Sequence, residues 1–200
     1  MGPKELIREV LATGFKVAAT EGNLNNEIGV PLSVLKFTED TRLGIIEMGA
    51  SHPDDLKPLL AVAEPTCGLI TNVGKAHLLG FGSFEGVVNT KTELYRFIKA
   101  HGHSVFVNRA NELLWGLAQE QSHISYGCHC GANYPVAQGL CNPYLSVNWK
   151  KRTVQTHLVG AYNFENVAAA IAVGQYFMVD ESKIAEALEA YTPTNSRSQV

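Results

Sequence analysis

Polar side chains follow two short apolar segments in the first half of the sequence. Residues 43–46 run into Glu47, and residues 67–73 are followed by Lys75 and His77. An apolar run closed by polar residues is typical of a buried parallel strand whose carboxyl end faces a functional site. A carboxylate and an imidazole at one sheet edge could hold Mg²⁺ or transfer a proton. Each also has a simpler explanation, because Glu47 could be an exposed strand end and lone histidines are often structural.

Two further polar segments are less informative alone. Asn23, Asn25 and Asn26 could form an ordinary turn or a ligand-binding loop, because Asn tolerates the backbone angles of turns. Lys91 and Glu93 lie within a helical pattern, where such residues normally form a solvated face. Neither segment predicts a function without the others.

The elements that would position these residues alternate between helices and strands. We expect helices over 4–13, 31–35, 53–63 and 84–100, and short strands over 16–20, 43–49, 67–73 and 103–108. This alternation predicts an α/β fold with a mostly parallel sheet flanked by helices. From about 123 to 158, short β-like runs separated by turns predict a small antiparallel β patch. Helices over 163–177 and 182–191 should follow, the second capped by Ser182.

The composition excludes several classes of protein. The 200 residues are 46% hydrophobic with a net charge of −3, which suits one compact domain and provides no basic surface for nucleic acid. No apolar run approaches the roughly 20 residues of a membrane span, so we expect no membrane insertion. A zinc site or disulfide frame is conceivable at Cys128, His129, Cys130 and Cys141. Cys-x-Cys is tighter than usual zinc spacing, and free thiols in a reducing cytosol are the simpler expectation.

Five segments, taken in order, resemble the signatures of the Mur ligase family. They are residues 20–32, 47–53, 70–78, 91–94 and 160–166, so the resemblance covers nearly the whole chain. Several ordered motifs are far more specific than any one. The Asn-x-Asn-Asn and Glu-Met-Gly-Ala-Ser-His-Pro segments look most like the members that add D-alanyl-D-alanine. The resemblance implies a central ATP-binding domain with a P-loop NTPase-like fold.

The resemblance also implies a reaction. Such enzymes use ATP and Mg²⁺ to phosphorylate a substrate carboxylate to an acyl phosphate, which an amine then attacks. The implied partners are UDP-N-acetylmuramoyl-tripeptide and D-alanyl-D-alanine, in cytoplasmic peptidoglycan precursor synthesis. These phosphate-rich reactants need cations to neutralise their crowded oxygens.

The resemblance also implies roles for nine residues of this chain. The implied catalytic residues and magnesium ligands are Glu47, His77 and Lys91, the last as a carbamate. The positions that approach the nucleotide correspond to Asn163, Asn166 and Arg197. The loop that faces the UDP-linked substrate corresponds to Thr20, Asn25 and Asn26.

One departure from the family pattern concerns the phosphate loop. The family's Gly-x-x-Gly-Lys-Thr should precede Lys4, where only Met1-Gly2-Pro3 stands. We therefore expect a central domain over 1–194 without that loop or the flanking N-terminal and C-terminal domains, a hinge over 195–200, and no activity from these residues alone. A Gly-x-x-Gly-Lys-Thr loop encoded just before Lys4 would favour the interpretation of the protein as an enzyme.

Two alternatives remain open at this point. A sister ligase, either another muramyl-peptide ligase or folylpolyglutamate synthase, would share the same acid, imidazole and lysine. A non-catalytic nucleotide-binding or partner-binding module would have lost the phosphate loop, and a genuine translation start at Met1 would favour it.

Overall fold

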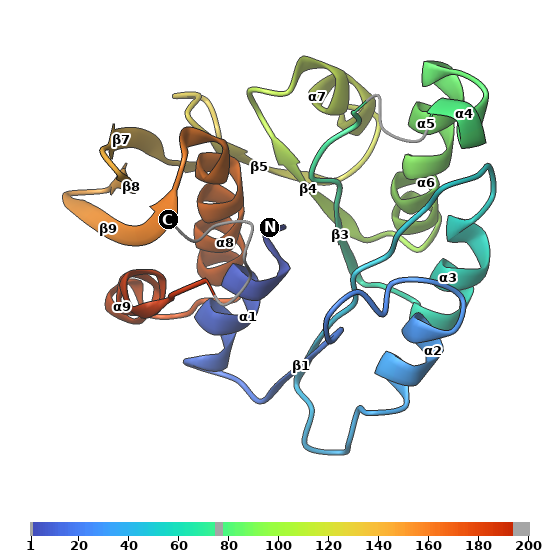
Figure 1. Cartoon of the computed structure of the whole chain (residues 1–200), viewed down its shortest axis with the longest axis horizontal. Coiled ribbons are helices and arrows are strands. Elements are labelled where there is room, and N and C mark those ends of the chain that lie inside the picture. Colours follow the sequence, from blue (N-terminus) through green and yellow to red (C-terminus); the bar gives the residue numbers. More distant parts are fainter. Residues whose placement is uncertain (1, 75–77, 194–200) are drawn as a thin grey trace. The chain divides into compact units, whose positions relative to one another are not determined.

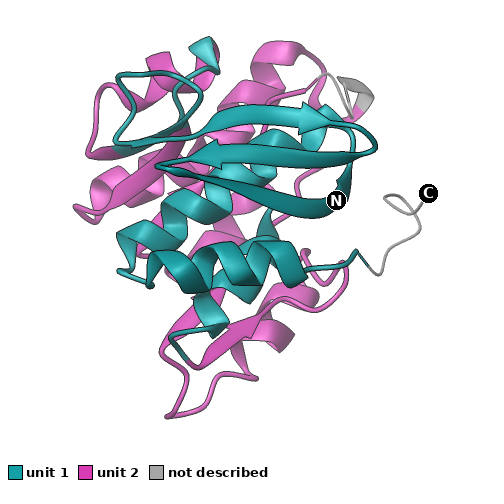
Figure 2. Ribbon diagram, turned by 90° about the vertical axis from the view of Figure 1, so that its left-hand side faces the viewer, with its two compact units in different colours: residues 1–15, 108–112, 124–200 teal, residues 16–107, 113–123 magenta. Residues whose placement is uncertain are grey.

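The computed structural model describes residues 2–74 and 78–193. The chain divides into two compact units, coloured separately in Figure 2. Unit 1 comprises residues 1–15, 108–112 and 124–200, and unit 2 comprises residues 16–107 and 113–123. None of the helices in the described part of the chain is long and apolar enough to cross a membrane.

Unit 2 contains two pairs of parallel strands. Strand β1 (Val17–Ala19) pairs with β2 (Leu43–Ile45), and β3 (Cys67–Leu69) pairs with β4 (Ser104–Asn108), whose last residue is grouped with unit 1. Parallel pairing requires crossover connections, and helices supply them here. The predicted parallel α/β architecture is confirmed, although the strands are shorter than the apolar runs suggested.

The helices of unit 2 lie in the connections between and after these strands. They are α2 (Gly29–Val34), α3 (Leu56–Ala63), α4 (Leu78–Phe81), α5 (Phe84–Lys91), α6 (Glu93–Ala100) and α7 (Glu112–Ala118). Helices α2, α3 and α6 lie on the same side of β1 and β3 in Figure 1. The single helix predicted over 84–100 is wrong, because the structure has two helices that meet at Thr92. The Thr92 hydroxyl donates to the carbonyls of Val88 (2.8 Å) and Asn89 (3.2 Å), while the Thr92 N–H keeps its bond to the Val88 carbonyl (2.9 Å).

Two apolar clusters form the core of unit 2. Met48 packs against the first cluster, which consists of Val30, Leu56, Leu59 and Leu60. The second cluster consists of Ile70, Val73, Phe81, Val87, Tyr95, Ile98, Val105, Val107, Leu114 and Ala118. Ala50 packs against both clusters. The segments that follow β2 and β3 therefore meet in one region of the unit.

Unit 1 contains an antiparallel patch that is smaller than the one predicted over about 123–158. It covers residues 137–159, whereas residues 123–127 and 134–135 form two strands that pair in parallel. Strands β7 (Ala137–Cys141), β8 (Tyr144–Trp149) and β9 (Arg152–Val159) form a three-stranded antiparallel sheet, which Figure 2 shows packed over helices. The other elements are α1 (Lys4–Ala12), β5 (His123–Gly127), β6 (Tyr134–Pro135), a 3₁₀ turn η1 (Ala161–Asn163), α8 (Phe164–Tyr176) and α9 (Glu181–Ala190). Helix α8 is central, since nine of its residues are buried.

Helix α8 ends in a Schellman motif with an unfavourable residue. Met178 donates its N–H to the Gln175 carbonyl (3.0 Å), and Val179 donates to the Gly174 carbonyl (2.9 Å). Met178 has a φ of 58°, which is a left-handed conformation, and its side chain is 89% exposed. Burial of the side chain therefore does not offset the strain of this conformation. Because Gly adopts this conformation without strain, Met178→Gly should raise the free energy of unfolding by about 1 kcal/mol in a urea titration. Met178→Ala is the control, and an equal gain from it would contradict the explanation.

Candidate functional site

Thr20 and Glu47 meet at the carboxyl ends of β1 and β2. The Thr20 hydroxyl accepts a hydrogen bond from the Glu47 N–H at 3.0 Å. Thr20 also donates its own N–H to the Ile45 carbonyl at 2.9 Å, extending the pairing of the two strands. Thr20 is only 2% exposed, whereas Glu47 is exposed. The structure thus brings a predicted substrate residue and a predicted metal ligand together.

The Asn-rich loop is anchored to the same segment and to α2. The Asn25 carbonyl accepts the Gly49 N–H at 2.7 Å, and Asn25 Nδ2 lies 3.5 Å from Glu47 Oε1. Asn26 Oδ1 accepts the N–H groups of Ile28 (3.2 Å) and Gly29 (2.9 Å), and so caps the start of α2. Asn26 therefore contributes to folding, a role that the sequence analysis did not anticipate. Substrate contact by Thr20, Asn25 and Asn26 stays a prediction.

Lys91 is held at the end of β3 by a residue that the sequence analysis did not single out. Its Nζ donates to the carbonyl oxygen of Asn72 at 2.7 Å. Lys91 is partly buried, and this burial lowers the pKa of its amine below the ordinary lysine value. The signal that could have identified it is a polar residue within the mostly apolar run 67–73, three residues beyond the end of β3.

Glu47 follows a strand of one sheet, and Lys91 contacts the segment that follows a strand of a second sheet. The chemistry of the two side chains fits a hard divalent cation on one condition. No group of three or more His, Cys, Asp or Glu side chains that could hold a metal occurs within residues 2–74 and 78–193. Glu47 offers a carboxylate, but an ammonium at Lys91 would repel a cation. A Lys91 carbamate would supply anionic oxygens, the donors that Mg²⁺ prefers, and carbamate formation needs the neutral amine that a lowered pKa favours. His77 lies outside the described residues.

Asn163 and Asn166 lie together in unit 1, at the start of α8. Asn163 is fully buried, donates from Nδ2 to the Val159 carbonyl (2.9 Å), and accepts from Asn166 Nδ2 at Oδ1 (3.3 Å). Both ends of the Asn163 amide are therefore engaged in joining β9 to α8. Asn166 is partly buried in the first turn of the helix. Nucleotide contact by either residue stays a prediction, and Arg197 lies outside the described residues.

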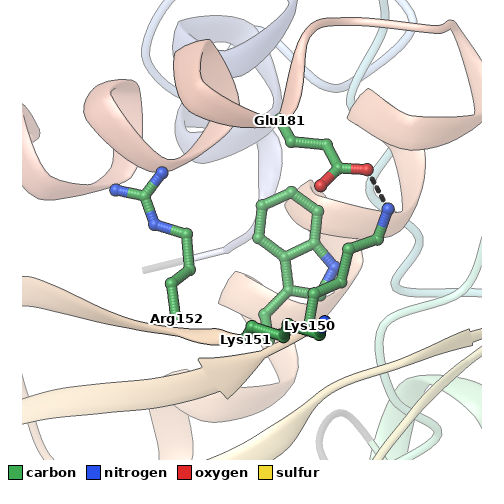
Figure 3. Close-up of a pocket in the computed structure, with 5 residues that line it drawn as sticks. Lys150, Lys151, Arg152 and Glu181 are labelled. Carbon is green, nitrogen blue, oxygen red and sulfur yellow. Dashed lines mark hydrogen bonds and ion pairs between the residues drawn. The ribbon is translucent and has the colours of Figure 1, made fainter.

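A shallow surface pocket lies elsewhere in unit 1, at the turn between β8 and β9. Figure 3 shows Lys150 and Glu181 paired across it. Arg152 Nη2 lies 3.8 Å from Glu189 Oε2, so acids of α9 accompany two of the three cations of the turn. The lining residues are Trp149, Lys150, Lys151, Arg152 and Glu181, and none of the seven predicted site residues that the structure describes is among them. We therefore assign no function to this pocket.

Comparisons with known proteins agree with the motifs. Residues 3–174 match the Mur ligase middle domain. The chain is 31% identical to UDP-N-acetylmuramoyl-tripeptide--D-alanyl-D-alanine ligase of Bacillus subtilis (strain 168), over 98% of this chain and 43% of that protein. The chain thus spans less than half the length of this curated relative.

Solved structures share the fold. A crystal structure of MurF from Acinetobacter baumannii superposes with a TM-score of 0.84 at 24% identity, over 98% of this chain and 44% of that one. The structure of MurF ligase from Thermotoga maritima in complex with ADP gives a TM-score of 0.81 at 25% identity, over 98% and 46% of the two chains. Since the family match covers most of the chain, the resemblance seen in the motifs is confirmed, and this chain belongs to the Mur ligase family as its middle domain.

Proposed function

We propose that the complete protein joins D-alanyl-D-alanine to UDP-N-acetylmuramoyl-tripeptide in an ATP-dependent reaction. The observation that carries this proposal is the attachment of the Asn-rich loop to the Glu47–Gly49 segment at one sheet edge. That loop would face the UDP-linked substrate, and Glu47 would face the metal and phosphates. The name of the Bacillus subtilis relative supports this choice of substrates.

The proposed chemistry assigns a task to each group of residues. A carboxylate oxygen of the tripeptide would bond to the γ-phosphorus of ATP as the bond from that phosphorus to ADP breaks. The amine of D-alanyl-D-alanine would then bond to the acyl carbon and lose a proton as phosphate leaves. Bound Mg²⁺ would neutralise the crowded phosphate oxygens. The residues proposed to hold it are Glu47, His77 and the Lys91 carbamate.

Nucleotide binding is the role proposed for a second group of residues. Asn163 and Asn166 of unit 1, with Arg197, are proposed to bind the nucleotide, and the ADP complex of the Thermotoga maritima relative supports nucleotide binding. Because its amide is already engaged at both ends, Asn163 would act mainly by fixing Asn166. We also propose that residues 1–194 form the central domain and that residues 195–200 form a hinge.

The cysteines support a cytoplasmic location for this reaction. All four thiols, Cys67, Cys128, Cys130 and Cys141, are free. Free thiols, two of them exposed, are expected of a protein that works in a reducing compartment. We therefore propose that the protein acts in the cytoplasm.

The test measures ADP release by the complete protein with MgATP and defined substrates. UDP-N-acetylmuramoyl-tripeptide and D-alanyl-D-alanine together should give ADP and the ligated product, and omission of either should abolish both. Parallel reactions would offer a single amino acid with a shorter muramyl peptide, and glutamate with a folate. Turnover only in one of these parallel reactions would identify a sister ligase, and turnover in none would favour a binding module.

A further inference from the structure

Thr20 is buried and uses its polar groups on the strand that precedes Glu47. Its exposed fraction is 2%. Its N–H donates to the Ile45 carbonyl at 2.9 Å, its hydroxyl accepts the Glu47 N–H at 3.0 Å, and the same hydroxyl lies 3.5 Å from the Ile45 carbonyl, to which it can donate. Burial and these contacts place the hydroxyl between the two strands and not on the surface.

Asn25 holds the same segment on the other side of Glu47. Its carbonyl accepts the Gly49 N–H at 2.7 Å. Gly49 lets the Asn25 side chain approach closely, since a Cβ built at Gly49 would lie 3.1 Å from Asn25 Cγ. Asn25 Nδ2 lies 3.5 Å from Glu47 Oε1. The backbone is thus fixed at both Glu47 and Gly49, while the Glu47 carboxylate itself stands at an exposed position.

We propose that Thr20 is a positioning residue that acts through Glu47 and does not contact the UDP-linked substrate. A metal ligand must be held close to its working geometry, and the position of the backbone from which it projects is part of that geometry. The Thr20 hydroxyl supplies one by fixing the backbone from which that carboxylate projects. This inference rests on the proposed function only in taking Glu47 as a metal ligand.

The test uses Mn²⁺ as a probe for the metal in the complete, ADP-bound protein, by electron paramagnetic resonance. Thr20→Val removes the hydroxyl at nearly constant volume and should weaken Mn²⁺ binding by about 10-fold, the usual effect of losing a group that orients a ligand. Thr20→Ser keeps the hydroxyl and should restore the affinity. In turnover experiments, Thr20→Val should lower kcat and leave the KM for the UDP-linked peptide unchanged.

Thr156 provides a matched control in unit 1. It is 3% exposed, and its hydroxyl donates to the Leu145 carbonyl (2.7 Å) and accepts the Leu158 N–H (3.2 Å), as the Thr20 hydroxyl does at β2. Thr156→Val should therefore lower stability much as Thr20→Val does and leave Mn²⁺ binding unchanged. Equal losses of Mn²⁺ affinity in the two variants would reveal a general effect on folding and overturn the proposal.

Other outcomes also overturn the positioning role. Unchanged Mn²⁺ affinity in Thr20→Val, or a raised KM for the UDP-linked peptide with normal metal binding, would return Thr20 to substrate contact or to folding alone. If Thr20→Val does not fold, the same titration is made on Thr20→Ala. Because the Mn²⁺ titration needs no turnover, a wild-type protein without ligase activity would refute the proposed function and leave this measurement interpretable.

Discussion

Replacing Lys91 with Ala should lower the rate of ligation by the complete protein at least about 100-fold, because the carbamate oxygens proposed to hold Mg²⁺ would be lost. Lys91 Nζ is already aimed at the end of β3 by its 2.7 Å hydrogen bond to the Asn72 carbonyl. Carbamate formation joins the neutral amine nitrogen to the carbon of CO₂ with release of a proton. Initial rates of ADP release at saturating substrates would measure the effect.

The lowered pKa of Lys91 determines whether ligation activity should rise or fall with pH. Burial lowers this pKa, so the neutral amine becomes available at lower pH than in an exposed lysine, and carbamylation should increase as pH rises toward the lowered value. Activity should therefore rise with pH and with bicarbonate.

Three variants separate a carbamate from a simple cation at this position. Lys91→Arg keeps a cation and should be as inactive as Lys91→Ala, and short carboxylic acids should partly restore Lys91→Ala. Lys99→Ala, which alters an exposed lysine 3.5 Å from Glu120, should retain wild-type turnover. Wild-type turnover by Lys91→Ala would refute the carbamate.

Replacing Gly29 with Ala should lower the free energy of unfolding by about 3 kcal/mol, because the added methyl group has no room. Gly29 begins α2 and is buried. A Cβ at this position would lie 2.4 Å from the Leu24 carbonyl carbon and 2.5 Å from Leu24 Cα, and both are backbone atoms. The Asn-rich loop would have to move, with loss of the Asn26 cap on α2. Urea titration of the chain would give the change in free energy.

Gly116 supplies the opposite case for the same substitution. It lies exposed within α7, and a Cβ there would meet no atom within 4 Å. Gly116→Ala should raise the free energy of unfolding by about 0.5–1 kcal/mol, since Ala loses less conformational freedom in a helix. Similar effects of the two substitutions would show that Leu24 does not crowd Gly29.

The fold could be predicted where apolar periodicity is strong. Helices α1, α8 and α9 lie within about two residues of their expected limits, because α1 and α9 bury an apolar face and α8 is a continuous apolar, alanine-rich run. The break at Thr92 could not be predicted, because the apolar spacing continues through it. The predicted Ser182 cap is wrong, since Asp180 Oδ1 accepts the Ser182 N–H at 2.8 Å. This second error concerns a side-chain hydrogen bond, which spacing does not encode.

The sequence predicts which candidate site residues lie near the ends of strands, but it does not predict their contacts. The position of Glu47 beyond β2 follows from the apolar run before it. The burial of Thr20 and its bond to Glu47 depend on the register between β1 and β2, in which Ala19 lies opposite Ile45. That register arises from tertiary packing, so the sequence could place Thr20 at the end of an expected strand but could not predict its contact with Glu47. The capping role of Asn26 was missed for the same reason, because it depends on where α2 begins.

The packing of Met48 bears on how the protein would respond to oxidants. Met178, at 89% exposure, could become a sulfoxide without loss of core contacts. Met48 is partly buried against the Val30, Leu56, Leu59 and Leu60 cluster, immediately after Glu47 in the chain. A polar sulfoxide there would disturb the apolar packing next to Glu47, the proposed metal ligand. Of the two methionines that the structure describes, only Met48 would therefore pass oxidative damage on to the proposed site, while oxidation of Met178 would leave the core intact.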